Sequence, residues 1–236
     1  MNTTIKTCIT IESIEGKTFF VGDIHACYDK LIQKLSAVSF DYLTDRLIAT
    51  GDLIDHGPDS EKCLMLLNEP WFYSVIGNHE IMVLDAVLHR KRNGERSMEQ
   101  RLHTHNGGHW FYEISEAKQD ELVDLIVTSM PVAYEVLIGD STIGVVHAAS
   151  RADWHKFKEE KDRMSMHLLA YYTWTRYEHP LPKKIQNIAA VVMGHQNDIE
   201  VVNMGNQLWI DTIKRTGELT MLSEVEVLER ISSHTV

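Results

Sequence analysis

The chain has 236 residues, of which 34 are acidic and 23 are basic, so its formal net charge is -11. Because a nucleic-acid interface needs clustered lysine and arginine to meet the phosphates, this acidic excess argues against a broad nucleic-acid surface. The contents of 44% hydrophobic and 24% charged residues are ordinary for a soluble globular protein. The length suits one large domain, and we expect a single domain over residues 1–236.

The cysteines and the apolar runs bear on the cellular compartment. Cys8, Cys27 and Cys63 show no C-x-x-C spacing, which predicts free thiols and a reducing compartment. No apolar run approaches the roughly 18 residues of a membrane-spanning helix. The first residues also lack the pattern of a signal peptide. We therefore expect a cytoplasmic protein with no membrane partner.

Short apolar runs recur along the chain, and each ends in polar residues. Their length and their β-branched and aromatic content favour buried strands. In chain order they are KTFFVGDIH, DRLIATGDLIDHG, WFYSVIGNHE, STIGVVHAA and IAAVVMGH.

Helical patterns separate the first three runs. CYDKLIQKLSAV predicts a helix with Leu31, Leu35 and Val38 on one face. DSEKCLMLLNE predicts a second helix with Asp59 or Ser60 as its cap. Strands that alternate with helices at this spacing predict a largely parallel sheet in an α/β architecture.

The remaining segments are less regular. Residues 79–130 are expected to hold further helices, including the amphipathic EAKQDELVDLIVTSM, and the polar stretch 90–100 a surface loop or a frayed helix end. Near the end of the chain, NQLWIDT and ELTMLSEVEVLE alternate apolar and polar residues as antiparallel strands do.

The polar clusters after the apolar runs suggest a shared site. They read D-x-H, G-D-x-x-D-H-G, G-N-H-E, H-A-A and G-H. Each motif alone is more often structural than functional, but all five in order, each after an apolar run, favour a common site. Function in parallel-sheet folds lies at the carboxyl ends of the strands, where these clusters occur. The residues concerned are Asp23, His25, Asp52, Asp55, Asn78, His79, His147 and His195.

These side chains are the ligands that divalent metal ions prefer. Carboxylate and amide oxygens suit hard cations, and imidazole suits iron, manganese or zinc. In an extended segment Asp23 and His25 would share a face and could bind one ion, and Asp52 could bridge to a second. Two ions roughly 3.5–4 Å apart can activate a water and hold a phosphate oxygen. The other ligands of the second ion would be Asn78, His147 and His195.

A histidine that does not bind metal could serve as the acid. Asn78 and His79 are adjacent, so in an extended or loop conformation their side chains diverge, and His79 can face the substrate. It would protonate the leaving-group oxygen. Asp55 is the natural partner to fix the tautomer of His79.

The motifs resemble those of the phosphoprotein phosphatase branch of the calcineurin-like metallophosphoesterases, and most of all the small bacterial and phage serine/threonine phosphatases of the bacteriophage lambda type. The family's G-D-x-H-G, G-D-x-x-D-R-G, G-N-H-E, H-A-[GD] and late G-H stand here as GDIHA, GDLIDHG, GNHE, HAA and GH. NGGHWFYEI, YTWTRYE and GNQLWIDT are similar too, so the resemblance runs from about Thr18 to Leu222.

This resemblance implies an α/β (α+β) fold with a central β-sandwich flanked by helices. It also implies two divalent ions, most often manganese, with iron, zinc or nickel as alternatives. His79 becomes the general acid paired with Asp55, and Arg176 in WTR matches the arginine that grips the substrate phosphate. The implied ligands of one ion are Asp23, His25 and Asp52. Those of the other are Asp52, Asn78, His147 and His195.

The residues that differ from the family motifs are at positions expected to lie near the substrate phosphate. Ala26 replaces a glycine, which matters if that position needs a positive φ. His56 stands where the family has a phosphate-binding arginine, and a neutral imidazole is a weaker substrate-binding group than a bidentate guanidinium. Ile76 and Ala149 also replace family residues. We expect an active metal centre with an altered substrate preference or reduced phosphomonoesterase activity, rather than an inactive metal-binding descendant.

Other polar residues are weaker candidates. The histidines of LHTHNGGHW lack acidic or cysteine partners, so a polar loop near the active site is favoured over another metal site. The aromatic residues Trp110, Phe111 and Tyr112 are expected to pack, although one could line the substrate cleft. Arg151 could supply the missing positive charge.

Three functions follow from these observations. The first is a phosphatase that acts on phosphoserine or phosphothreonine in a phosphorylated protein, or on a small phosphoester, by in-line attack of a hydroxide bound to the two metals. The alternative is a nucleotide phosphodiesterase or dinucleoside polyphosphate hydrolase, because the symmetrical dinucleotide hydrolases share openings similar to GDIHACYDKL. The third is a binding module that keeps the metal site only as a scaffold.

Overall fold

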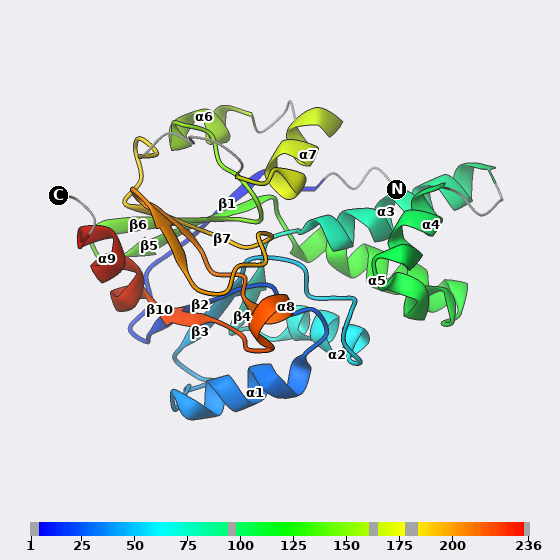
Figure 1. The fold of residues 1–236 in the computed structure, drawn as a ribbon, viewed down its shortest axis with the longest axis horizontal. Coiled ribbons are helices and arrows are strands. Elements are labelled where there is room, and N and C mark those ends of the chain that lie inside the picture. Colours follow the sequence, from blue (N-terminus) through cyan, green and yellow to red (C-terminus); the bar gives the residue numbers. More distant parts are fainter. Residues whose placement is uncertain (1–4, 94–97, 161–164, 178–183, 234–236) are drawn as a thin grey trace.

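The computed structural model describes residues 5–93, 98–160, 165–177 and 184–233, which form two β-sheets packed face to face between helices (Figure 1). In spatial order, the six-stranded sheet consists of β1 (Cys8–Ile11), β5 (Ala133–Ile138), β6 (Ser141–Val146), β7 (Ala190–Met193), β9 (Gln207–Trp209) and β8 (Val202–Met204). The four-stranded sheet consists of β10 (Met221–Ser223), β2 (Thr18–Val21), β3 (Arg46–Ala49) and β4 (Phe72–Ser74). The sandwich expected from the family resemblance is confirmed.

Parallel pairing predominates in both sheets. β2 pairs with β3 and β3 with β4 in parallel, while β10 is antiparallel to β2. In the larger sheet β6, β7 and β9 run parallel, whereas β5–β6 and β8–β9 are antiparallel pairs. Phe20 and Ile48 from one sheet, with Val75 just after β4, belong to the same buried cluster as Val145 and Val192 from the other sheet. Burial of each such side chain stabilises the fold by about 1.5–3 kcal/mol.

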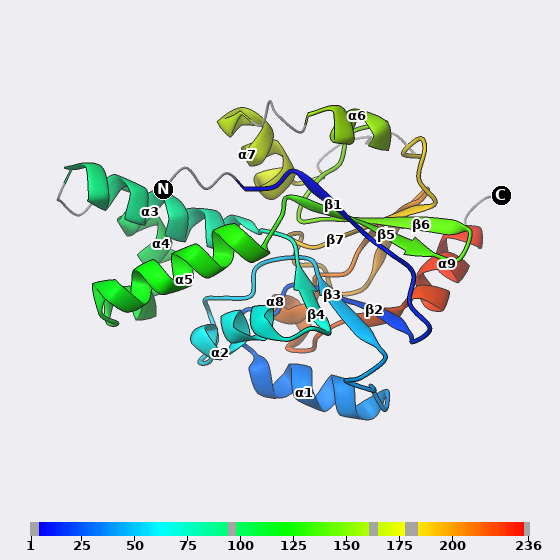
Figure 2. The ribbon, with the colours of Figure 1, turned by 180° about the vertical axis from the view of Figure 1, so that it is seen from behind.

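Helices cover both outer faces of the sandwich. The helices are α1 (Tyr28–Ala37), α2 (Ser60–Met65), α3 (Asn78–Asn93), α4 (Met98–His105), α5 (Glu116–Ser129), α6 (Trp154–Glu159), α7 (Met166–Trp174), α8 (Ile213–Thr216) and α9 (Glu224–Ser232). Two 3-10 turns, Leu66–Asn68 and Gly108–Tyr112, complete them. Figures 1 and 2 show α1 and α2 outside the smaller sheet, α6 and α7 outside the larger one, and α3, α4 and α5 grouped at one side.

The first two predicted helices are present, with two corrections. Leu31 and Leu35 are buried, but Val38 lies one residue beyond the end of α1 and is exposed, because the chain turns away at Ser39 with φ 53°. Asp59 is the residue before α2, yet its side chain pairs with Lys62 at 2.7 Å and makes no capping hydrogen bond.

The alternating apolar and polar residues near the end of the chain predicted strands, and only part of this stretch forms them. NQLWIDT contains β9, and ELTMLS contains β10, but α9 begins at Glu224 where a strand was expected. A capping box starts this helix: Ser223 N donates to Glu226 Oε2 at 2.8 Å, and Ser223 Oγ accepts from Glu226 N. The helix buries Val227 against the sandwich core.

The segment from 79 to 130 is more helical than expected. α3 continues through Asn93 and α4 begins at Met98, so the polar stretch 90–100 is largely helix, and residues 94–97 lie outside the described residues. The amphipathic helix is confirmed as α5, and Ser115 caps it by accepting from Lys118 N.

Candidate metal centre

The predicted metal ligands follow strand ends that meet at one edge of the sandwich. The metal-binding atoms of Asp23, His25 and Asp52 lie within 4.8 Å of one another, as do those of Asp52, His147 and His195. All five side chains are buried. Asp52 belongs to both groups, as a carboxylate between two ions must. The structure therefore brings these residues together as the sequence predicted, and their role as ligands remains a prediction.

Asn78 completes the second group. Its Oδ1 lies 2.9 Å from His147 Nε2, while His147 Nδ1 lies 2.7 Å from the carbonyl oxygen of Thr50. Since a carbonyl oxygen only accepts, Nδ1 donates to it, which leaves Nε2 as the ring atom that faces the amide oxygen and can offer a lone pair to a metal ion. A cation held between Nε2 and Oδ1 would satisfy both. The donor set therefore fits a divalent ion at this place.

Tight turns rather than extended chain present these side chains. Positive φ angles occur at His25 (44°), Ala26 (56°), Asp52 (49°) and His195 (69°). The expectation that Asp23 and His25 share a face of an extended segment is therefore wrong, because the chain turns at His25. The condition stated for Ala26 is met, because this residue does adopt a positive φ where the family has a glycine. Such conformations cost about 1–2 kcal/mol for a residue with a Cβ and cluster at functional sites.

Two glycines leave room for the carboxylates. A Cβ on Gly77 would lie 2.1 Å from Asp52 Oδ1, and one on Gly194 would lie 1.9 Å from Asp23 Oδ1. The carboxylate of Asp23 is held by Thr50 Oγ1 and His195 N, at 2.9 and 3.0 Å. Because Gly77 and Gly194 have no Cβ, they leave the space that the carboxylates of Asp52 and Asp23 occupy.

The charges at the site also favour cations. Burial, followed by the carboxylates of Asp211 and Asp52, raises the pKa of Asp23 well above its ordinary value. Burial lowers the pKa of His25 well below its ordinary value and that of His195 to about 3, so both rings offer neutral lone pairs. Crowded carboxylates beside neutral imidazoles are what divalent ions would stabilise.

The predicted acid and its partner are in direct contact. His79 Nδ1 lies 2.6 Å from Asp55 Oδ2, and both residues are buried. Asn78 and His79 begin helix α3 rather than an extended segment, and successive helical side chains still point about 100° apart. Burial opposes protonation of His79, but the carboxylates of Asp52 and Asp55 outweigh it and raise its pKa.

Sequence reasoning missed two further partners of Asp55. His103 Nε2 lies 3.1 Å from Asp55 Oδ2, and Trp110 Nε1 donates to Asp55 Oδ1 at 2.7 Å. His103 is fully buried on α4, and its Nδ1 lies 3.0 Å from the hydroxyl of Tyr112. The segment LHTHNGGHW is thus no simple polar loop, and Trp110 does more than pack. The available signal was a run of three histidines followed directly by three aromatic residues, Trp110, Phe111 and Tyr112.

Glu80 in G-N-H-E has a structural task that sequence reasoning did not assign. Its buried carboxylate accepts from the backbone N–H groups of Asp52, Leu53 and Gly77, at 3.1, 2.8 and 2.9 Å. Burial raises its pKa to about 7, with Asp52 adding to the effect. Glu80 therefore joins the loop after β3 to the start of α3.

Comparison with known proteins identifies the family. The family model described as calcineurin-like phosphoesterase matches residues 16–208. The chain belongs to this family.

Relatives of this metallophosphoesterase cover most of its length. Serine/threonine-protein phosphatase 2 of Salmonella typhimurium is 32% identical over 203 residues, which are 81% of this chain and 85% of that protein. Serine/threonine-protein phosphatase 1 of the same organism is 40% identical over 154 residues, covering 61% of this chain and 68% of that protein. Both are bacterial phosphatases, as the motifs had suggested.

Two further similarities are more limited. A symmetrical bis(5'-nucleosyl)-tetraphosphatase of Baumannia cicadellinicola is 41% identical over 78 residues, which cover 32% of this chain and 27% of that protein. A solved serine/threonine phosphatase from Saccharomyces cerevisiae shares the fold, with a TM-score of 0.59 at 15% identity over 88% of this chain and 71% of that one.

The site of the metallophosphoesterase opens through a cavity of about 130 Å³. Arg176 lines this cavity, as the resemblance implied, and its guanidinium donates to the carbonyl oxygen of Gln196 at 3.1 Å. His56 is exposed beside it, with its ring centre 4.8 Å from that of His25 and 5.1 Å from that of His79. The partial burial of the His56 ring is the larger cause that lowers its pKa, and the positive charge of Lys214 adds to it. Together they lower the pKa to about 4, so the ring is neutral as expected.

The other cations near the site differ from expectation. Arg151 binds Glu160 at 2.8 Å and contacts Tyr172, and it does not line the cavity. Lys214 on α8 does line it and was missed, because α8 follows β9 in a segment without a family motif.

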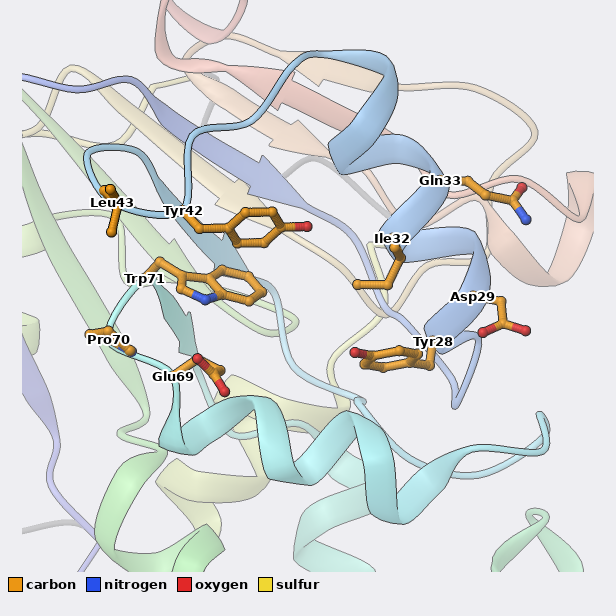
Figure 3. A pocket seen from close by; sticks show the side chains of 9 residues that line it. All are labelled: Tyr28, Asp29, Ile32, Gln33, Tyr42, Leu43, Glu69, Pro70 and Trp71. Carbon is orange, nitrogen blue, oxygen red and sulfur yellow. The ribbon is translucent and has the colours of Figure 1, made fainter.

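A wider groove lies apart from this site. It has a volume of about 840 Å³ and is bordered by α1, the turn at Tyr42 and Leu43, and the segment before β4, with Trp71 in its wall (Figure 3). It shares no lining residue with the metal centre. Among the helices of the described residues, none has the length and apolar character to cross a membrane.

Proposed function

We propose that this chain hydrolyses phosphomonoesters at its dinuclear divalent metal centre, with manganese as the native metal. The chain acts in the cytoplasm, and one domain over residues 1–236 carries the activity. Its substrates are phosphoserine or phosphothreonine in a protein, or a small phosphoester. The observation that supports this most is Asp52, which is shared by two groups of metal-binding side chains next to the His79–Asp55 pair. Bound divalent ions supply the positive charge that activates an attacking water and neutralises the phosphoryl oxygens.

The chain's own residues supply the acid. His79 Nδ1 contacts the Asp55 carboxylate, so Nε2 is the atom that can give a proton to the leaving-group oxygen. Asp55 stabilises the protonated ring and fixes its orientation. The raised pKa of His79 favours the protonated form near neutral pH, which is the form that an acid needs.

Other groups at the site position the substrate. Arg176 lines the cavity and offers a planar guanidinium to a phosphate oxygen. A thiol nucleophile is not available, because burial raises the pKa of both Cys27 and Cys63, and no cysteine lines the cavity. Attack by water without a phosphoenzyme is therefore the supported route.

The test compares three substrates with several divalent metals. A phosphopeptide, a dinucleoside tetraphosphate and bis-p-nitrophenyl phosphate would be assayed with manganese, iron, zinc and nickel. We expect the phosphopeptide to be hydrolysed and manganese to support the highest rate. His79→Asn should lower kcat by about 10²–10⁴-fold, whereas His105→Asn, an exposed histidine on α4, should match the wild type.

The alternative, a dinucleoside polyphosphate hydrolase, is supported by the 41% identity to a tetraphosphatase over 78 residues. Turnover of diesters and dinucleotides without turnover of the phosphopeptide would favour it. If His79→Asn and Asp52→Asn change no measured hydrolysis and added metal has no effect, the hydrolysis does not come from this site, and the binding module replaces the enzyme as the proposed function.

A further inference from the structure

Lys214 stands at the mouth of the metal-centre cavity. It lies on α8, the short helix between β9 and β10, and it lines the cavity together with Arg176. Its side chain is exposed. Within the described residues, its ammonium group has no carboxylate partner within ion-pair distance and no hydrogen bond. An ammonium group that makes no ion pair and no hydrogen bond at the mouth of this cavity can bind an anionic substrate.

The segment that carries Lys214 is held in place by its neighbours. Thr212 Oγ1 donates to Glu218 O at 2.8 Å and lies 2.9 Å from Thr220 Oγ1. Arg215 Nε donates to Asn197 O at 3.1 Å, which ties α8 to the loop after β7. These bonds fix the backbone of α8 at the rim, so Lys214 reaches the cavity without an ordering step in the loop.

The charged residues that line the cavity show which side chains could bind an anionic substrate. The buried carboxylates Asp23 and Asp52 belong to the metal groups, and Arg176 and Lys214 are the arginine and lysine that line the cavity within the part of the chain that the structure describes. His56 at the rim is neutral. The positive charge of Lys214 acts on His25, His56 and His79 alike, so it lies within electrostatic reach of the proposed acid and of one metal group.

We propose that Lys214 is a substrate-binding residue that, together with Arg176, binds the phosphate and makes this metallophosphoesterase prefer phosphomonoester dianions to diester monoanions. The inference rests on the proposed phosphatase function and adds the cation that selects the ester. A dianion gains about twice the Coulomb attraction of a monoanion from the same ammonium, because the energy scales with the product of the charges. Lysine provides a point charge on a flexible stem, so it selects charge rather than one fixed geometry.

The test measures Michaelis constants for p-nitrophenyl phosphate and bis-p-nitrophenyl phosphate. We expect Lys214→Ala to raise KM for the monoester about tenfold, as loss of a charged hydrogen bond does, with kcat within about threefold. KM for the diester should rise less than about threefold. Lys214→Arg should restore most of the monoester affinity. The matched control is Lys156→Ala, which removes an exposed lysine from α6, outside the cavity.

An equilibrium measurement gives a second readout. Titration of the manganese-loaded protein with inorganic phosphate should show about tenfold weaker binding for Lys214→Ala, while thermal unfolding of the variant matches the wild type. Equal changes for both esters, or unchanged phosphate binding, would overturn the assignment of Lys214. If the wild type hydrolyses the monoester and His79→Asn abolishes this while Lys214→Ala has no effect, the inference fails and the proposed function stands.

Discussion

Asp55 is the residue whose replacement tests the structure most directly. Its carboxylate lies within hydrogen-bond distance of His79 Nδ1, His103 Nε2 and Trp110 Nε1, at 2.6, 3.1 and 2.7 Å. Burial alone would raise the pKa of Asp55, but the hydrogen bonds from His103 and His79 outweigh it and lower the pKa to about 2 from an ordinary 3.8. At about 1.4 kcal/mol per pH unit, the ionised carboxylate contributes about 2.5 kcal/mol to folding.

The replacement Asp55→Asn keeps the shape and removes the charge. An amide offers one oxygen acceptor and presents an NH₂ group to the remaining N–H donors. We expect the free energy of unfolding at pH 7 to fall by about 2–3 kcal/mol. Because the folded pKa is depressed, this stabilisation is complete above about pH 5 and is lost as the pH falls toward 2. We also expect kcat to fall by about 10–100-fold, since His79 loses the group that orients it.

The assay is urea unfolding in the presence of a chelator, so that metal binding does not add to the measured stability. Asp59→Asn is the matched control, because Asp59 lies in the same loop and pairs with the exposed Lys62. A surface pair of this kind is worth less than about 1 kcal/mol. If Asp55→Asn destabilises the protein no more than the control does, the three hydrogen bonds are not the cause of the depressed pKa.

Three further predictions concern the metal centre and its surroundings. Gly194→Ala places a Cβ 1.9 Å from Asp23 Oδ1, so calorimetry should show manganese binding at least about tenfold weaker. The control is Gly139→Ala, whose Cβ would have nothing within 4 Å. It should bind manganese normally and lose only about 1 kcal/mol of stability, because of its positive φ. Chelation of divalent ions should abolish activity and lower Tm, because ions that bind only the folded state stabilise it; an unchanged Tm would count against a metal site. His56→Arg should raise activity on simple phosphomonoesters by providing a guanidinium, and equal or lower activity would show that His56 does not limit phosphate binding.

The local pattern of apolar and polar residues predicted most of the strands and helices, and it failed where two sequence signals competed. The apolar runs became strands because short β-branched and aromatic segments bury well on both faces. At the end of the chain, the alternation in SEVEVLE suggested a strand, but the capping box from Ser223 to Glu226 started α9. That box is a sequence signal, and giving it more weight than the alternation would have corrected the prediction. Val38 was misplaced because α1 ends at Ala37.

The sequence by itself determined which residues gather at the metal centre. Asp23, Asp52 and Asn78 follow strands of the smaller sheet, and His147 and His195 follow strands of the larger one. Each residue comes at the carboxyl end of an apolar strand, and these ends meet at one edge of the sandwich. Their side-chain types then indicate the chemistry, because clustered carboxylate, amide and imidazole groups suit divalent cations.

Only the tertiary structure decided what surrounds that centre. His103 and Trp110 meet Asp55 across 48 and 55 residues of chain, and Lys214 reaches the cavity from a helix without a motif. The turn at His25, which brings its ring to Asp23 and Asp52, also depends on long-range contacts: the backbone N–H of His25 donates to Asp52 O at 2.9 Å. Such contacts are set by how helices and loops pack on the sheets, and no local periodicity encodes them.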